Sequence, residues 1–229
     1  MTSRPLALVT GASRGIGAAV ATALAPTHDL LLGGRDADAL DAVAGAITGH
    51  GSVRSWPVDL TDPEALAAAA AEIGQLDVLV HSAGVGVLGT VAETDAATWR
   101  RQFDVNVVAV AELTRLLLPV LRAARGTVVL VNSGAGLAAR PGWGSYAASK
   151  SALRAFGDAL RGEEPELRVT SVHPGRVDTD MQRGVVAHEG GTYDASRYLR
   201  PESVATAVVT AVTAGPDAHV TEIVVRPTG

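Results

Sequence analysis

The chain contains no cysteine, and this absence excludes disulfide bonds, thiolate metal sites and cysteine nucleophiles together. Its six histidines show no spacing typical of metal ligands. We therefore predict no metal site, and any catalysis must use other side chains.

Long apolar runs and clusters of basic residues are missing as well. No run approaches the length of a membrane span, and residues 1–4 carry no apolar leader segment. The formal net charge is −5, and the lysines and arginines are scattered rather than gathered in a stripe. We expect a cytoplasmic protein that binds neither membranes nor nucleic acid.

The 229 residues include no linker, repeat or charge block, so a single domain spanning 1–229 is expected. Short apolar runs alternate with segments of helical periodicity, which predicts an α/β fold: a doubly wound, Rossmann-type parallel sheet of about seven strands with helices on both faces. The expected strands are 6–10, 29–33, 53–58, 77–81, 126–131, 167–173 and 220–226. The expected helices are 15–24, 37–47, one starting near 61–64, 95–125, 146–162 and 201–212.

A glycine-rich turn, from Gly11 to Gly17, follows the first expected strand and precedes a helix. Glycines there permit a tight turn and let a pyrophosphate approach the free N–H groups at the helix N-terminus. The spacing is Gly-x3-Gly-x-Gly, and glycine triples also occur in ordinary tight turns. The strand before the turn and the helix after it favour a dinucleotide site.

The second expected strand ends in Gly34-Arg35-Asp36. An arginine at this point accommodates the 2′-phosphate of NADP, and Ser13 and Arg14 offer further donors for it. We therefore prefer NADP(H) over NAD(H), although Arg35 could also be a solvated surface residue. Asp36 is expected to cap the next helix.

Asp59, after the third strand, could hydrogen-bond an adenine edge or simply hold a turn. The helix beyond it begins either with a capping box of Thr61 and Glu64 or with Asp62 as the cap ahead of Pro63.

Tyr146 and Lys150 are spaced i, i+4 at the start of an expected helix and so share one face. A cation roughly 4 Å from a phenol favours the phenolate by about three pKa units, which would make the tyrosine a usable proton donor near neutral pH. The pair could also be an ordinary surface pair. Ser133 ends an apolar strand, and unless it is a plain loop serine, it and Tyr146 offer two hydroxyls to one carbonyl oxygen.

Other segments bear on the substrate and on assembly. Asn106 interrupts the long helical segment 95–125, where it predicts a kink or a cap. Residues 107–121 are apolar nearly all round, so we expect a homo-oligomer, a dimer or tetramer, through this helix and the 146–162 helix. Residues 180–200 are expected to form a mobile lid near the substrate. With Trp143 and the 135–141 loop, its Met181, Tyr193 and Tyr198 would shape an apolar pocket.

In combination these motifs resemble the short-chain dehydrogenase/reductase family over essentially the whole chain. Thr10-Gly11-x3-Gly15-x-Gly17 matches its cofactor turn, Asn106, Ser133, Tyr146 and Lys150 match its catalytic tetrad, and Pro174-Gly175 through Thr179 matches its nicotinamide-side motif. The cofactor-binding residues so implied or expected are Thr10, Gly11, Ser13, Arg14, Gly15, Ile16, Gly17, Arg35, Asp59, Leu60, Ser82, Ala83, Gly84, Tyr146, Lys150, Pro174, Gly175, Val177 and Thr179.

The resemblance also implies roles. Tyr146 would protonate the carbonyl oxygen that Ser133 holds, and Lys150 would lower the pKa of Tyr146 and bind the nicotinamide ribose. Asn106 would anchor a water that links Lys150 to solvent. Thr179 and the backbone of Val177 would hold the carboxamide.

One position departs from the family pattern. Where the family usually has Asn-Asn-Ala-Gly, this chain has His81-Ser82-Ala83-Gly84, which puts the sheet contact at position 81 in doubt. The expected function is NADPH-dependent reduction of a small ketone or aldehyde to an alcohol. The alternatives are an NAD-linked alcohol dehydrogenase that acts oxidatively and a non-catalytic NADP(H)-sensing protein.

Overall fold

A parallel sheet of seven strands forms the centre of the molecule in the computed structural model, which describes residues 4–49 and 51–228. The strand order is β3-β2-β1-β4-β5-β6-β7, and every neighbouring pair is parallel. The strands are β1 (Leu6–Thr10), β2 (Asp29–Gly34), β3 (Val53–Pro57), β4 (Val78–His81), β5 (Thr127–Val131), β6 (Arg168–Pro174) and β7 (Glu222–Val225). The predicted fold class is confirmed.

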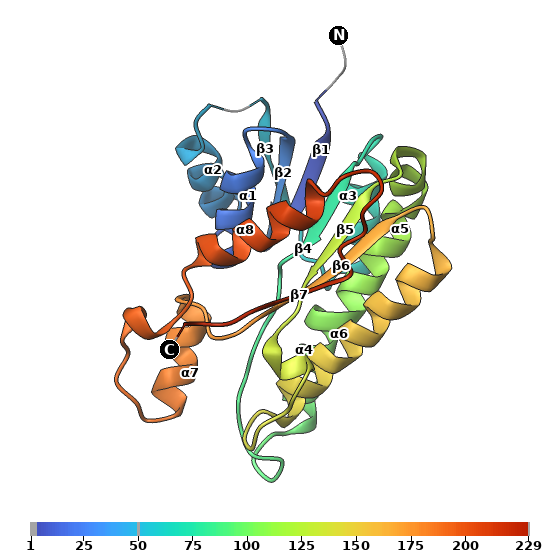
Figure 1. Ribbon diagram of the computed structural model, residues 1–229. Coiled ribbons are helices and arrows are strands. Elements are labelled where there is room, and N and C mark those ends of the chain that lie inside the picture. The colour runs from blue at the N-terminus through green and yellow to red at the C-terminus, as the bar shows by residue number, and fades with distance from the viewer. Residues whose placement is uncertain (1–3, 50, 229) are drawn as a thin grey trace.

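Helices cover both faces of this sheet (Figure 1). On one face lie α1 (Gly15–Leu24), α2 (Ala37–Ala46) and α8 (Pro201–Val212), and on the other lie α3 (Pro63–Ala71), α5 (Ala109–Ala124) and α6 (Gly144–Glu163). Each face has its own aliphatic core, and every residue of β5 is buried between them. A strand enclosed on both sides needs a continuous apolar run, which is why the central strands were readable from the sequence.

Two helix starts follow the expected capping chemistry. The Asp36 side chain accepts a hydrogen bond from the Ala39 N–H and caps α2, as predicted. For α3 the structure uses Asp62, which accepts from the N–H groups of Glu64 and Ala65. Thr61 instead donates its hydroxyl to Asp59, so it is not the cap.

The long helical segment is divided at Asn106. Helix α4 (Ala96–Phe103) passes into a π-helical segment, η1 (Asp104–Val108), which leads directly into α5. A π turn closes i→i+5 hydrogen bonds and so holds an extra residue. The predicted irregularity at Asn106 is therefore confirmed, in the form of a π segment rather than an end cap.

The expected lid region is largely ordered into short helices. It contains α7 (Asp180–His188) and a 3₁₀ turn, η3 (Ala195–Arg197), while another 3₁₀ turn, η2 (Gly134–Gly136), follows β5. Figure 1 places α4 and α7 beyond the sheet, in the lower half of the view. That this region moves as a lid stays a prediction.

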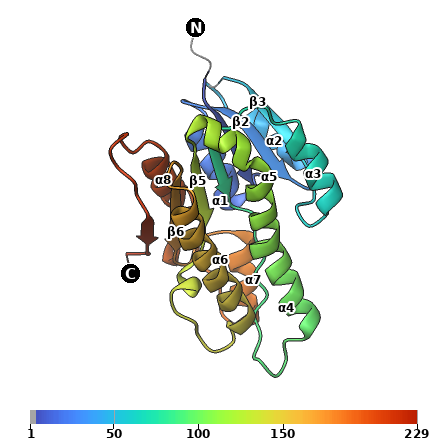
Figure 2. The same ribbon diagram turned by 90° about the vertical axis from the view of Figure 1, so that its right-hand side faces the viewer.

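Figure 2 shows α5 and α6 side by side along one side of the molecule. Within residues 4–49 and 51–228, no helix is long and apolar enough to cross a bilayer, and no group of His, Asp and Glu side chains could hold a metal ion. Leu116, Leu118 and Val120 of α5 are only partly buried. Association through α5 and α6 stays a prediction.

Candidate active site

The glycine turn and the loop after β4 lie where the strand order of the sheet reverses, between β1 and β4, a position at which open α/β sheets bind ligands. The Thr10 hydroxyl, at the end of β1, accepts hydrogen bonds from the N–H groups of Ser82 and Ala83 at 3.1 and 3.2 Å. It also donates to the Val80 carbonyl at 3.3 Å. Thr10 thus joins the ends of the two central strands.

His81 does not disturb the sheet. β4 keeps its parallel register with β1 and with β5, and the His81 ring lies 2.9 Å from the Thr114 hydroxyl of α5 through Nε2. Complete burial lowers the pKa of His81 to about 3, so the ring is neutral at physiological pH. The doubt about position 81 is resolved: its side chain contacts a helix, and the hydroxyl at the end of β1 links the strands.

The glycine turn forms a cradle for an anion. Gly11 has φ +66°, and a Cβ there would lie 2.8 Å from the backbone of Ala83. A Cβ on Gly17 would lie 2.2 Å from the Gly11 carbonyl oxygen. Helix α1 begins at Gly15 without a side-chain cap, so its first-turn N–H groups face the turn. These features fit the pyrophosphate of a dinucleotide.

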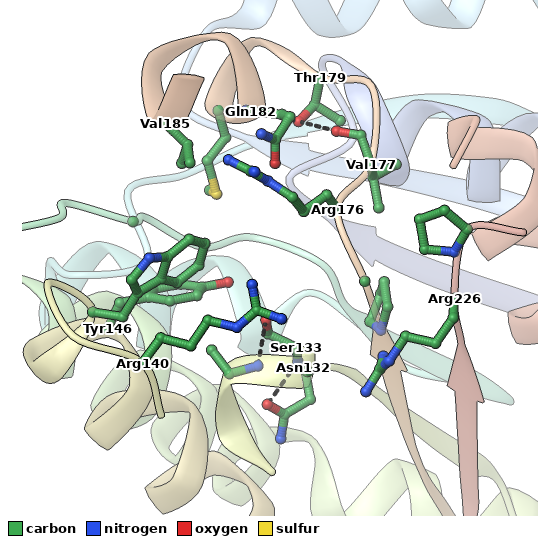
Figure 3. A pocket seen from close by; sticks show the side chains of 18 of the residues that line it. Asn132, Ser133, Arg140, Tyr146, Arg176, Val177, Thr179, Gln182, Val185 and Arg226 are labelled. Atoms are coloured by element: carbon green, nitrogen blue, oxygen red, sulfur yellow. Dashed lines mark hydrogen bonds between the residues drawn. The ribbon is translucent and has the colours of Figure 1, made fainter. Parts of the chain in front are cut away.

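The two proposed catalytic hydroxyls line one cavity. Ser133 follows β5, Tyr146 lies in the first turn of α6, and both border a cavity of about 410 Å³. Tyr146 is only 8% exposed, and Ser133 accepts a hydrogen bond from the Ala135 N–H at 3.1 Å. Figure 3 shows the Tyr146 hydroxyl directed toward Ser133. The structure thus brings the Ser133 and Tyr146 side chains together at one cavity, as predicted.

Lys150 and Asn106 lie behind this pair. The Lys150 ammonium is buried and donates to the Val131 carbonyl at 3.1 Å. Gly84 brings the two side chains together, because a Cβ on it would lie 3.6 Å from Lys150 Nζ and 3.2 Å from Asn106 Oδ1. The Asn106 amide exchanges two hydrogen bonds with the Val85 backbone, both at 2.9 Å. It therefore positions the loop after β4, and water anchoring stays a prediction.

The acid–base properties differ from our expectation. Burial raises the pKa of Tyr146, and a hydrogen bond with Ser133 opposes this rise only in part. Burial also lowers the pKa of Lys150 to about 8. The Lys150 ammonium is directed at the Val131 carbonyl, and the cost of burying a phenolate is the largest influence on Tyr146. The prediction that Lys150 lowers the pKa of Tyr146 is therefore wrong for this structure.

The nicotinamide-side motif meets the glycine turn. Thr179 caps α7 by accepting from the Gln182 N–H at 3.3 Å. A Cβ on Gly15 would lie 3.3 Å from the Thr179 methyl, so the two motifs are in contact. The motif residues that line the same cavity as Tyr146 are Ile16, Pro174, Gly175, Val177 and Thr179.

The adenosine end is more open. Arg35 is exposed and helps to lower the pKa of Asp59, although hydrogen bonds from Thr61 are the larger cause. Asp59 accepts from both the N–H and the hydroxyl of Thr61, as the turn alternative predicted. Arg14 lies 3.7 Å from Asp180 across the cleft, with both side chains largely exposed. Neither Arg14 nor Arg35 lines the cavity at the catalytic end.

Sequence reasoning missed part of the cavity wall. Trp143 and Met181 line it as expected, whereas Tyr193 and Tyr198 do not. Four arginines also line it and were not identified from the sequence, namely Arg140, Arg176, Arg197 and Arg226. Two of them could have been found, because Arg176 lies inside the motif after β6 and Arg226 follows β7 at the same edge of the sheet.

Comparisons with known proteins agree with this geometry. The family model for short chain dehydrogenases matches residues 5–190. Glycine betaine reductase of Emericella nidulans is 36% identical over 98% of this chain, which spans 19% of that protein. Cis-4-hydroxycyclohexanecarboxylate dehydrogenase of Sinomonas cyclohexanicum is 36% identical over 89% of this chain and 87% of its own length.

A solved structure supports the same assignment. The alcohol dehydrogenase of the archaeon Thermococcus sibiricus, complexed with 5-hydroxy-NADP, superposes with a TM-score of 0.90 and is 28% identical, covering 98% of this chain and 97% of that one. The family match, the similarity to these enzymes and the position of the cavity at the carboxyl ends of the parallel strands lead to one conclusion. The chain belongs to the short-chain dehydrogenase/reductase family of oxidoreductases.

Proposed function

We propose that the protein reduces a ketone or aldehyde to an alcohol with NADPH, and that Tyr146 is the proton donor. The observation that carries the proposal is the convergence of Ser133 and Tyr146 on one cavity whose far wall is the nicotinamide-side motif. The similar alcohol dehydrogenase complexed with 5-hydroxy-NADP supports the choice of a phosphorylated cofactor. Arg35 and Arg14 at the adenosine end supply cations for its 2′-phosphate.

Each residue then has a task in reduction. NADPH, when bound, supplies the hydride for the carbonyl carbon. Ser133 donates a hydrogen bond to the carbonyl oxygen, and Tyr146 gives up its phenolic proton to the same oxygen. A solvent proton restores the phenol, so each turnover consumes one NADPH and one proton. Lys150 would hold the nicotinamide ribose by donating hydrogen bonds from its ammonium group.

Reduction needs Tyr146 in its protonated form. A phenol with a pKa above its ordinary value is fully protonated at neutral pH, which is the state a proton donor needs. Oxidation of an alcohol would need the phenolate instead. An oxidative role is nevertheless the second candidate, because one relative at 36% identity is a dehydrogenase of a hydroxy acid. Comparing both directions between about pH 6 and pH 9 would separate them.

The direct test is Tyr146→Phe, which removes the hydroxyl and keeps the ring. We expect kcat to fall by about 10²- to 10⁴-fold, while the Kd for NADPH, measured by calorimetry, changes by less than about threefold. Tyr198→Phe is the matched control, since Tyr198 does not line the cavity, and it should keep kcat. Substantial turnover by Tyr146→Phe would overturn the assignment of the acid.

A further inference from the structure

Positive charge is concentrated in the cavity beside Tyr146. Its lining includes four arginines, whereas none of the described residues that line it is an aspartate or a glutamate. Arg140, Arg197 and Arg226 are exposed and keep much of their hydration, but like charges around one cavity still repel one another. The arrangement is therefore one that a bound anion would relieve.

Two of these arginines, Arg140 and Arg226, lie near Ser133 and have no acidic partner. Arg140 lies in the loop between β5 and α6, and Figure 3 shows its guanidinium extending toward Ser133. Among residues 4–49 and 51–228, no carboxylate forms an ion pair with Arg140 or with Arg226. Both guanidinium groups thus remain available for an anion.

Arg226 is fixed in place by the backbone. Its Nη1 donates to the carbonyls of His173 and Val225 at 2.9 and 3.2 Å. Its guanidinium also lies against Gly134, where a Cβ would come within 3.1 Å of Nη2. Gly134 directly follows Ser133, so this cation is held one residue from a catalytic hydroxyl. Its Nη2 and Nε are left to bind a ligand.

Arg176 provides the contrast. It forms an ion pair with Glu189 and lies over the Tyr198 ring, 5.6 Å from the centroid. Its charge is already balanced by Glu189, unlike the charges of Arg140 and Arg226. The phosphates of the cofactor do not account for the other two, because Ser13, Arg14 and Arg35 lie outside the cavity lining.

We propose that the substrate carries an anionic oxygen group, a carboxylate or a phosphate, which Arg140 and Arg226 hold while the carbonyl lies against Ser133 and Tyr146. Guanidinium groups bind both kinds of group through paired, charge-assisted hydrogen bonds. A cavity of about 410 Å³ is of the size that holds a small molecule. The placement of the carbonyl rests on the proposed function, whereas the anion subsite rests on the arginines alone.

The first experiment compares matched substrates. A series of straight-chain oxo acids, with two to four carbons between the ketone and the carboxylate, is assayed with NADPH beside the corresponding carboxamides and phosphate monoesters. We expect at least one anion to exceed its neutral analogue by about tenfold or more in kcat/KM. The carboxylate and phosphate arms identify which anion is used.

The second experiment measures binding without turnover. Calorimetry on the NADPH complex compares saturated fatty acids of the same length, which lack a ketone, with their amides. Arg140→Gln and Arg226→Gln should each weaken carboxylate binding by about tenfold. Each should also reduce the ratio of carboxylate affinity to amide affinity. Where phosphate is the preferred group, the alkyl phosphates replace the fatty acids. Arg100→Gln, an exposed arginine of α4 outside the cavity, is the control and should bind like the wild type.

The outcomes separate the two proposals. Neutral carbonyls reduced as fast as every anionic analogue, or anion binding that neither arginine substitution weakens, would overturn the anion subsite while carbonyl reduction stood. Arginine-dependent anion binding in a protein that reduces no carbonyl compound would support the subsite and overturn the proposed function. Retention of anion affinity by the Arg140→Gln/Arg226→Gln double variant would also overturn the anion subsite.

Discussion

The two ends of the cleft differ in how firmly the protein holds its polar side chains. At the catalytic end Tyr146 and Lys150 are buried, and the Asn106 amide has its hydrogen bonds supplied by the protein. At the adenosine end Arg35 is exposed, and no ion pair with it is found among the described residues. The fold therefore holds the side chains proposed for proton transfer in fixed positions, whereas the side chain proposed to discriminate between cofactors is exposed.

The largest effect is expected where burial is greatest. Lys150→Met keeps the aliphatic stem and removes the ammonium group, so the proposed contact with the nicotinamide ribose is lost. We expect kcat to fall by about 10²- to 10⁴-fold in a steady-state NADPH assay. A variant with near-normal kcat would show that the buried amine is structural.

The same substitution should change the pH dependence of stability. The pKa of Lys150 is about 8 in the folded protein, below the ordinary lysine value of 10.5, so between these two values the unfolded chain binds more protons. In this pH range the contribution of Lys150 to the free energy of unfolding therefore rises with pH, by about 2 kcal/mol between about pH 7.5 and 9.5. Urea unfolding at both pH values should show that gain in the wild type and not in Lys150→Met. Equal gains in the two proteins would contradict it.

An effect of similar size on stability, without loss of turnover, is expected at the sheet near the catalytic end. The pKa of His81 is lowered from 6.5 to about 3, so the unfolded chain takes up a proton as the pH falls below 6.5 while the folded protein does not. Wild-type stability should fall by about 2 kcal/mol from about pH 7 to pH 5 because of this group. His81→Asn should lack that loss in urea unfolding, whereas His188→Asn, at an exposed position, should keep it.

The smallest effect is expected at the adenosine end. Arg35→Ala should raise the Kd for NADPH by about tenfold, because a charge-assisted hydrogen bond to the 2′-phosphate is lost. The Kd for NADH should change by less than about twofold, and both are measurable by fluorescence titration. Arg54→Ala, an exposed arginine on β3, serves as the control. Equal weakening of both cofactors would remove the argument for NADPH.

This contrast also explains what could be predicted from the sequence. Strands such as β5 and caps such as Asp36 depend on local patterns and were placed correctly. Tyr146 and Ser133 were found because each follows a recognisable boundary of an element. The pKa of Tyr146 was predicted in the wrong direction, since helical spacing reports proximity to Lys150 but neither burial nor the Val131 carbonyl that the ammonium contacts.

The gathering of four arginines around one cavity was missed for a different reason. Arg140, Arg176, Arg197 and Arg226 belong to four separate segments, and each alone looks like an ordinary surface residue. Only the parallel register of β5, β6 and β7 brings the ends of these segments together. Long-range pairing of this kind leaves no local signature in the sequence.

The π segment from Asp104 to Val108 has a consequence for how this site could change during evolution. Its extra residue shifts the rotational phase of α5 relative to α4, and the buried Asn106 amide lies within that shift. Deleting one residue here would restore a regular helix and rotate everything on one side of it by about 100°. A change in the length of this helix would therefore displace Asn106 from the site even with its side chain unchanged.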